Sequence, residues 1–207
     1  MATEANGEAG GPDGGPVRTS DVPGGQPVER ASLVRSSIEW VVIIGVALLG
    51  AFIIRTLLFQ AFFIPSPSMT PTLKVHDRLL VNKLSYDVHP VHRGDIVVFK
   101  RSALRGTSEG GIKDLVKRVI GLPGETVESS PDGHMEINGR ELSEPYLPSG
   151  TPSTGVAPTI IPPGHYWVMG DNRTNSADSR VFGPIGKGQI VGRAFILIWP
   201  VQDFGLL

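Results

Sequence analysis

The sequence of 207 residues contains no cysteine. Without a thiol, the chain cannot form disulfide bonds, thiolate zinc sites, iron–sulfur clusters or a cysteine nucleophile. Any covalent catalysis must therefore proceed through another side chain. A domain of this chain outside the cytoplasm would also depend on packing alone for its stability.

The chain also lacks a large net charge of either sign. Its 19 lysine and arginine residues nearly balance its 20 aspartate and glutamate residues, which gives a formal net charge of −1. Nucleic-acid-binding proteins usually carry a basic excess. We therefore expect no nucleic-acid partner.

The first 29 residues contain few large apolar side chains. Glycine and proline make up 11 of these 29 residues. Such a stretch cannot bury enough apolar surface to offset the entropy lost on ordering. The sequence therefore predicts a disordered tail over residues 1–36.

An uncharged apolar run follows this tail. It contains 15 residues, from Trp40 to Ile54, and apolar residues continue beyond Glu39 and Arg55 on its two sides. A membrane-spanning helix needs about 20 residues. Residues 37–58 supply that length and place the two charges near the interfaces, so we expect a single transmembrane anchor. A buried core helix and a cleaved signal peptide are the alternatives, and flanking charges do not decide the orientation.

Residues 59–207 have the composition of a soluble β-rich domain. Their apolar runs are short and rich in β-branched residues, which is typical of strands. We expect strands over residues 79–81, 95–100, 115–120, 166–169 and 189–199. Asn138-Gly139 is a hairpin signal, and a proline-rich loop is expected from Pro145 to Pro163.

Two residues could carry nucleophilic chemistry. Ser68 lies in the segment Ile64–Leu73, where three prolines stiffen the backbone and could hold a hydroxyl in place. Lys117 lies on a strand whose faces are apolar except for this residue and Arg118. Burial there would lower the lysine pKa below about 10.4, so that a neutral amine could accept a serine proton. The alternative for Ser68 is that its segment is only a rigid linker. The alternative for Lys117 is that it lies on an edge strand with its amine in water.

A loop dense in short polar side chains runs from Gly170 to Arg180. It contains no large apolar residue and places Asp178 two positions before Arg180, so that the two could pair. A solvated turn and a divalent-cation loop are the alternatives, although the ligand pattern of an EF-hand is missing. His89 and His92 have a spacing that could suit a metal, but no glutamate lies nearby. We expect no metal ion and no cofactor.

Four sequence blocks follow the apolar run in order: Pro65–Leu73, Gly94–Phe99, Lys117–Gly124 and Gly170–Arg180. Together they resemble the bacterial type I signal peptidases, membrane-anchored serine proteases that remove signal peptides from exported proteins. The resemblance implies a mainly β fold: a single N-terminal transmembrane helix followed by a catalytic domain over residues 59–207, with a variable insertion over residues 121–165. It further implies a single-pass protein of the bacterial cell membrane, with a cytoplasmic N-terminus and an extracytoplasmic catalytic domain.

The resemblance assigns a Ser-Lys dyad to this chain. Ser68 would be the nucleophile, and neutral Lys117 would be its general base. The backbone N–H of Ser68 and the hydroxyl of Ser66 would form the oxyanion hole. Ser176 matches the family serine that hydrogen-bonds the lysine.

The resemblance also implies supporting and substrate-binding residues. Asp178 and Arg180 match an ion pair that supports the site. Phe62, Ile64 and Val116 would line shallow pockets for a peptide bound as an added strand. Such pockets admit small side chains, consistent with cleavage after an A-x-A-like sequence. The expected partners are signal peptides of exported preproteins and the lipid bilayer, and we expect a monomer.

Two positions depart from the family pattern. Thr174 stands where the family often has aspartate, and Pro67 stands where it often has glycine. Pro67 should stiffen the segment that leads to Ser68. Neither departure changes the two residues of the dyad.

Two rival functions share parts of this pattern. The self-cleaving repressor peptidases resemble this family in fold and dyad, but they carry a DNA-binding domain where this chain has a tail and an anchor. A membrane-anchored β domain that only binds a partner would make Lys117 and the serines beside Met69 coincidences.

Overall fold

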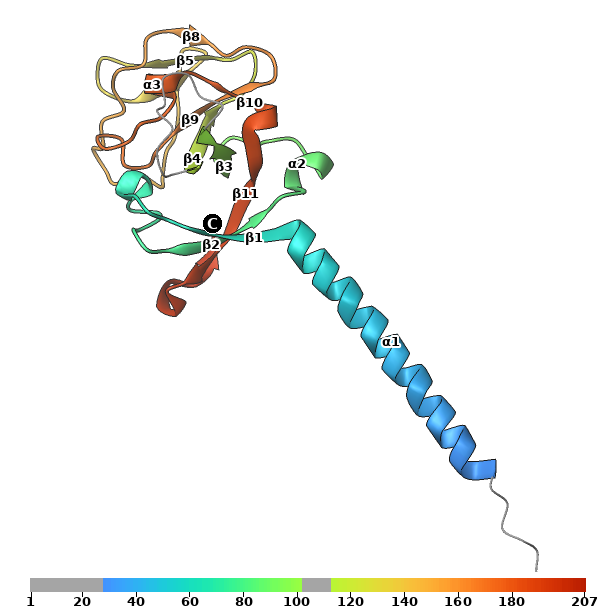
Figure 1. Cartoon of the computed structure of the whole chain (residues 1–207). Coiled ribbons are helices and arrows are strands. Elements are labelled where there is room, and N and C mark those ends of the chain that lie inside the picture. The colour runs from blue at the N-terminus through green and yellow to red at the C-terminus, as the bar shows by residue number, and fades with distance from the viewer. Residues whose placement is uncertain (1–27, 102–112) are drawn as a thin grey trace, which may run out of the picture. The chain divides into compact units, whose positions relative to one another are not determined.

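A computed structural model of the chain describes residues 28–101 and 113–207 (Figure 1). For residues 28–37 and 53–57 it describes the backbone alone. The chain divides into two compact units, residues 1–47 and residues 48–207. Of the predicted tail, residues 1–36, the part up to residue 27 lies outside the described residues.

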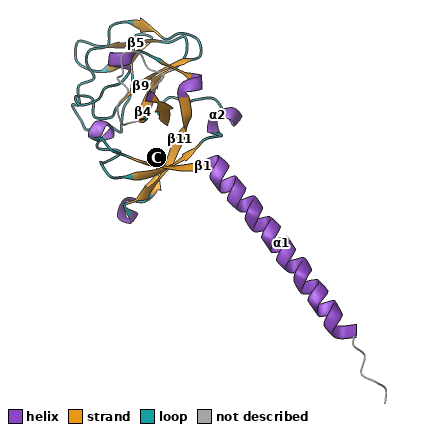
Figure 2. Ribbon diagram, in the orientation of Figure 1, coloured by secondary structure: helices purple, strands orange, loops and turns teal. Residues whose placement is uncertain are grey.

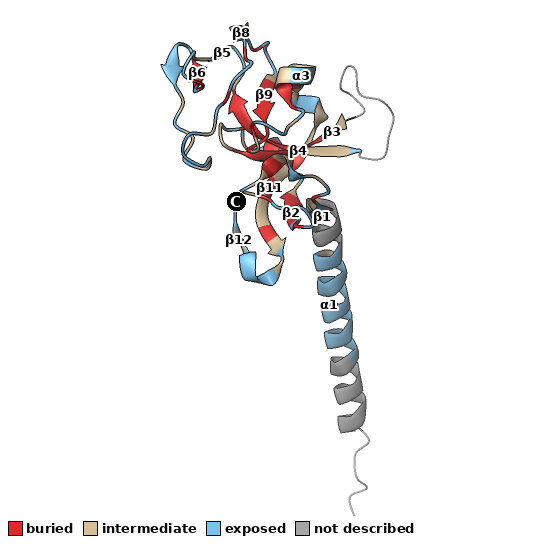
Figure 3. Ribbon diagram, turned by 90° about the vertical axis from the view of Figure 1, so that its left-hand side faces the viewer, coloured by how far each residue is buried: buried red, intermediate tan, exposed pale blue. Residues whose placement is uncertain are grey.

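Helix α1 runs from Val28 to Leu58. It begins before residue 37, the expected start of the anchor, because the preceding stretch contains Glu, Arg, Ala and Leu, which favour helix. The described side chains of this helix, at residues 38–52, are mostly exposed (Figure 3). Among the described residues, no helix reaches the combined length and hydropathy needed to cross a membrane, so the anchor stays a prediction.

The second unit contains a larger sheet with the strand order β1-β2-β11-β3-β4-β9-β10, and β12 pairs with β11. Its neighbouring strands are antiparallel. The five strands expected from the sequence are β2, β3, β4, β9 and β11, which confirms the mainly β fold. The strand bounds are β1 Phe59–Phe63, β2 Arg78–Asn82, β3 Ile96–Lys100, β4 Asp114–Gly121, β9 His165–Met169, β10 Ile185–Gly186, β11 Ile190–Trp199 and β12 Gly205–Leu206.

The residues between β4 and β9 form a smaller sheet in the order β7-β6-β5-β8. Its strand β5 is labelled in Figure 2. Its strands are β5 Thr126–Ser129, β6 Met135–Ile137, β7 Arg140–Glu141 and β8 Thr159–Ile160. Asn138 and Gly139 join β6 to β7 with positive φ values of 53° and 71°, as the hairpin signal predicts. The expected loop from Pro145 to Pro163 therefore includes a strand, and it contributes Val156 and Ile161 to a buried cluster with strands of both sheets.

Short helices connect the strands. The α-helices are α2 Ser85–Val88 and α3 Ser179–Phe182, and the 3-10 helices are η1 Pro67–Met69, η3 Lys187–Gln189 and η4 Val201–Asp203. In the larger sheet, buried residues concentrate on β3, β4 and β9 (Figure 3). One cluster joins Ile64 and Met69 to β2, β3 and β11, so the segment around η1 is fixed to the sheet from both sides.

Candidate active site

Ser68 lies in the middle of helix η1, between a proline and a buried methionine. Met69 is buried in the core cluster beneath the larger sheet. The backbone N–H of Thr70 donates to the Pro67 carbonyl at 3.1 Å, which closes the short helical turn. Because Pro67 fixes φ and Met69 is anchored by packing, the Ser68 side chain is held in one place at the surface of the sheet.

Lys117 reaches Ser68 from strand β4. Its Nζ donates a hydrogen bond to Ser68 Oγ at 2.6 Å and another to the Val116 carbonyl at 3.0 Å. Lys117 pairs with Val97 in the sheet register and is 2% exposed. An exposed lysine head, which was the alternative interpretation, is therefore excluded, and the structure brings the two predicted residues into contact.

The environment of Lys117 disfavours its charged form. Burial lowers the pKa of this lysine from 10.5 to about 8, although the nearby carboxylates of Asp178 and Asp171 act in the opposite direction. Burial is the larger effect because it removes water from the ammonium group. The amine can therefore be neutral in a useful fraction of molecules near neutral pH.

Ser66 lies beside the Ser68 hydroxyl. The two Oγ atoms are 3.3 Å apart, and either can be the donor. Ser66 has extended backbone geometry at the start of η1 and is half-buried. Its hydroxyl can therefore point to the same small volume in which Ser68 would attack a carbonyl group.

Asp178 and Arg180 form the predicted pair. Arg180 Nε and one terminal nitrogen donate to the two carboxylate oxygens of Asp178, each at 2.9 Å. Asp178 is fully buried and also accepts the Gly170 N–H at 3.0 Å. Burial alone would raise the pKa of this carboxyl, but the bonds from Arg180 and Gly170 outweigh it and the pKa is lowered. The charge of Asp178 is therefore stabilised close to the site.

Ser176 does not make the contact that the resemblance implies. The bonds of the Lys117 amine go to Ser68 and Val116, and no hydrogen bond joins this amine to the buried Ser176 Oγ. It lies close enough to Asp178 to help lower the pKa of that carboxyl. It also packs against Gly170, where an added Cβ would lie 2.3 Å from Ser176 Oγ.

Two further residues of the loop contact the segments that carry Ser68 and Lys117. The Asn172 backbone N–H donates to the Ser68 carbonyl at 3.1 Å, and its side chain donates to the Pro67 carbonyl at 3.1 Å. Asp171 accepts two bonds from Arg118, at 2.9 and 2.7 Å. Sequence reasoning missed these roles. A signal was available for Arg118, because a cation on an apolar strand needs a carboxylate partner when it is buried.

A narrow cleft lies beside the dyad, between the end of β1 and the first half of β4. Its volume is about 40 Å³, and the three predicted substrate-binding residues line it together with Ser68 and Lys117. Sequence reasoning missed other members of the lining: Phe63, Pro65, Met69, Asp114 and Leu115. The cleft has room for small side chains next to Ser68.

Backbone edges on both sides of the cleft lack a strand partner in the described part of the chain. Strand β1 pairs only with β2. Strand β4 pairs with β3 over residues 114–118 but with β9 only from Arg118 onward. Val119 directs its N–H and C=O toward the β3 side, so alternation directs those of Val116 toward the cleft. An extended peptide can therefore pair with the protein on either side.

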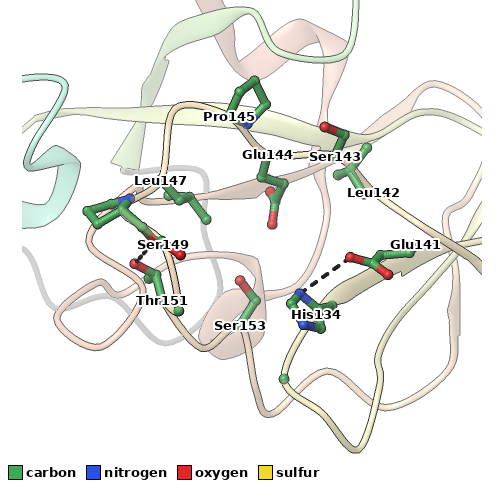
Figure 4. A pocket seen from close by; sticks show the side chains of 13 residues that line it. His134, Glu141, Leu142, Ser143, Glu144, Pro145, Leu147, Ser149, Thr151 and Ser153 are labelled. Atoms are coloured by element: carbon green, nitrogen blue, oxygen red, sulfur yellow. Dashed lines mark hydrogen bonds and ion pairs between the residues drawn. The ribbon is translucent and has the colours of Figure 1, made fainter.

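A larger hollow of about 590 Å³ lies in the insertion and contains neither dyad residue (Figure 4). Its lining includes His134 and Glu141, whose Nδ1 and Oε1 atoms are 3.6 Å apart. In residues 28–101 and 113–207, no group of three acidic or histidine side chains is arranged to hold a metal ion. The rings of His89 and His92 are 5.9 Å apart between centroids.

Comparisons with known proteins match this chain to one family. Residues 37–199 match the family model described as "Signal peptidase, peptidase S26". The chain is 41% identical over 191 residues to a signal peptidase I of Leptolyngbya laminosa, covering 91% of this chain and 93% of that protein. It is 32% identical over 232 residues to a signal peptidase I of Mycobacterium tuberculosis, covering 88% of this chain and 78% of that protein.

Further relatives include a solved structure. The chain is 36% identical over 184 residues to a signal peptidase IB of Staphylococcus aureus, covering 81% of this chain and 92% of that protein. A crystal structure of a signal peptidase I from Enterococcus faecalis V583 is 32% identical, with a TM-score of 0.41, over 51% of this chain and 97% of that chain.

Proposed function

This chain belongs to the signal peptidase family S26, whose members are serine peptidases, and we propose that it cleaves signal peptides from exported preproteins with a dyad of Ser68 and Lys117. The observation that carries this proposal is the contact of 2.6 Å between Lys117 Nζ and Ser68 Oγ at the end of a narrow cleft. A buried amine beside a fixed hydroxyl is the arrangement that an activated serine nucleophile needs.

The proposed mechanism begins with proton transfer across the 2.6 Å contact. Neutral Lys117 accepts the proton of Ser68 Oγ as that oxygen attacks the scissile carbonyl. The backbone N–H of Ser68 and the Ser66 hydroxyl stabilise the oxyanion. The Lys117 ammonium then gives its proton to the leaving amine, which yields an acyl-enzyme and the free mature protein. Water, activated by the neutral amine, hydrolyses the ester and releases the signal peptide.

The substrate is proposed to bind as an added strand between the unpartnered edges of β1 and β4. Main-chain hydrogen bonds would hold the peptide in an extended form, and the cleft would select its side chains. Phe62, Ile64 and Val116 make the cleft apolar, and its volume of about 40 Å³ suits side chains of the size of alanine. This supports cleavage after an A-x-A-like sequence.

We also propose that residues 37–58 anchor the enzyme in the bacterial cell membrane. The described part of α1 carries a run of exposed apolar side chains, including Trp40, Val46, Leu48 and Phe52. Such a surface is unfavourable in water and favourable in hydrocarbon. The proposed topology has a cytoplasmic N-terminus and the peptidase domain on the far side of the membrane, where preproteins emerge.

The test is cleavage of a preprotein by the full-length chain in detergent, with N-terminal sequencing of the product. We expect one cut at the signal junction. Ser68→Ala and Lys117→Ala should each abolish it while the far-ultraviolet circular dichroism spectrum stays unchanged. Ser149→Ala and Lys113→Ala change exposed residues outside the cleft and should cleave as the wild type does. Full activity in either dyad variant would overturn the proposal.

A further inference from the structure

Arg173 is a buried cation that forms an ion pair with Glu144, a residue of the insertion. Its side chain is 0% exposed, and that of Glu144 is 9% exposed. Two guanidinium nitrogens donate to the two carboxylate oxygens of Glu144, at 2.9 and 2.6 Å. The same nitrogens donate to Ser153 Oγ and to the Tyr146 hydroxyl. A bidentate pair of this kind fixes both orientation and distance.

Arg173 also hydrogen-bonds to the backbone of the loop that contacts Ser68. Its Nε donates to the Gly170 carbonyl at 3.1 Å. The neighbouring residue, Asn172, donates its backbone N–H to the Ser68 carbonyl at 3.1 Å. A continuous series of short contacts therefore leads from Glu144, through Arg173, to the backbone of Ser68.

Tyr146 makes a second connection, to Arg118, which follows Lys117 on β4. The Arg118 guanidinium carbon lies 3.9 Å from the centre of the Tyr146 ring, a distance at which a cation is attracted to an aromatic face. The Tyr146 hydroxyl donates to Glu144. Burial and the Glu144 carboxylate raise the pKa of this phenol, so it remains a donor.

We propose that Glu144 and Tyr146 are positioning residues, which hold Arg173 and Arg118 so that the Gly170–Arg180 loop keeps Ser68 against Lys117. The inference rests on the proposed function, because it concerns the same dyad. Neither residue lines the cleft beside the dyad, which is built from residues 62–69 and 114–117. Their loss should therefore lower kcat and leave KM unchanged, because the geometry of the reacting groups changes while substrate contacts remain.

The hollow in Figure 4 supplies a matched control for this role. Glu144 and Glu141 both line the hollow. Glu141 is 67% exposed and pairs with His134, whereas Glu144 binds Arg173. Glu141→Gln therefore removes the same charge from the same hollow without touching the series of contacts that leads to Ser68.

The experiment measures kcat and KM for preprotein cleavage by the full chain in detergent, normalised to the folded fraction from circular dichroism. We expect Glu144→Gln and Tyr146→Leu to lower kcat roughly 10- to 100-fold, because small misplacements of reacting groups cost about this much. Tyr146→Phe keeps the ring over Arg118 and should retain most of the activity that Tyr146→Leu loses. Glu141→Gln should match the wild type. Glu144→Asp keeps the charge but withdraws the carboxylate, so it should fold and still lose kcat.

Three outcomes would overturn the inference. The first is a wild-type kcat per folded molecule in Glu144→Gln, or in Glu144→Asp where the glutamine variant does not fold. The second is a raised KM with unchanged kcat. With either of these two outcomes, the proposed function would still hold if the wild type cleaves the preprotein and Ser68→Ala does not. The third is no cleavage by the folded wild type, which would overturn both proposals.

Discussion

Lys117 Nζ lies 2.6 Å from Ser68 Oγ, although the two residues are 49 positions apart in the chain. Strand β4 supplies the amine, and the proline-framed helix η1 supplies the hydroxyl. Burial lowers the pKa of the amine to about 8, so about one tenth of the molecules hold it neutral at pH 7. The contact and the lowered pKa together support a serine nucleophile that needs no histidine.

Removing the Ser66 hydroxyl should slow the chemical step. If this hydroxyl stabilises the oxyanion, Ser66→Ala should lower kcat about 100- to 1,000-fold with little change in KM. Ser66→Thr keeps a hydroxyl and should be far less impaired. Steady-state kinetics on a preprotein substrate measure both values, with Ser149→Ala as the exposed serine control. Wild-type kcat in Ser66→Ala would remove this residue from the oxyanion hole.

Gly170 is required where the loop approaches the nucleophile. A Cβ at this position would lie 2.4 Å from the Ser68 carbonyl oxygen and 2.3 Å from Ser176 Oγ. Since the first of these atoms belongs to the backbone, Gly170→Ala should shift the Ser68 segment and lower kcat more than tenfold. Gly188→Ala is the control, because a Cβ there meets nothing within 4 Å. Equal activities of the two variants would contradict the close approach.

The Asp178–Arg180 pair should contribute strongly to stability. Asp178 is fully buried and Arg180 is 15% exposed, so Asp178→Asn leaves a poorly solvated cation. We expect a loss of about 3 kcal/mol in the free energy of unfolding, measured with urea. Asp203→Asn breaks the exposed pair with Lys74 and should cost less than about 1 kcal/mol. Similar losses in the two variants would show that burial does not set the strength of the pair.

Sequence reasoning predicted the strands and named Ser68 and Lys117, which the structure brings into contact, but it did not predict the contacts that hold them. Short β-branched runs mark β3, β4, β9 and β11, and the order of motifs assigns Ser68 and Lys117. The contacts of Arg118 with Asp171, and of Arg173 with Glu144, join residues far apart in the chain. Nothing local in the sequence specifies such pairs, because they depend on how distant strands and loops are brought together in the fold.

The position of Ser176 shows the same limit. Its match to a family motif predicted a hydrogen bond to Lys117, but no hydrogen bond joins the two side chains in the structure. The proline-rich stretch over residues 145–163 was predicted to be a loop, because its prolines interrupt the strand pattern. Val156 and Ile161 are nevertheless buried there, since the small sheet needs apolar residues on its inner face.

Burial of Lys117 should make stability depend on pH. Below about pH 8 the lysine is protonated in both the folded and the unfolded state, and the cost of burying its charge is fully present. Between about pH 8 and pH 10.5 the unfolded state binds more protons, so stability rises with pH. The fall in pKa from 10.5 to about 8 corresponds to about 3 kcal/mol.

Lys117→Met removes this titration and supplies the comparison. Its unfolding free energy, measured with urea at a series of pH values, should lack the rise that the wild type shows. As the pH increases, the free energy of unfolding of the wild type should therefore rise relative to that of the variant. A constant difference across the range would mean that the pKa of this lysine is not lowered in the folded protein.

The most direct test of the Ser-Lys dyad is the pH dependence of kcat/KM for preprotein cleavage by the wild type. Because the base must be neutral, kcat/KM should rise with pH through a single apparent pKa of about 8, the value that burial gives Lys117, and then level off. A profile that is flat from about pH 6 to about pH 10, or one that rises only near the ordinary lysine pKa of about 10.4, would contradict a buried, neutral lysine base.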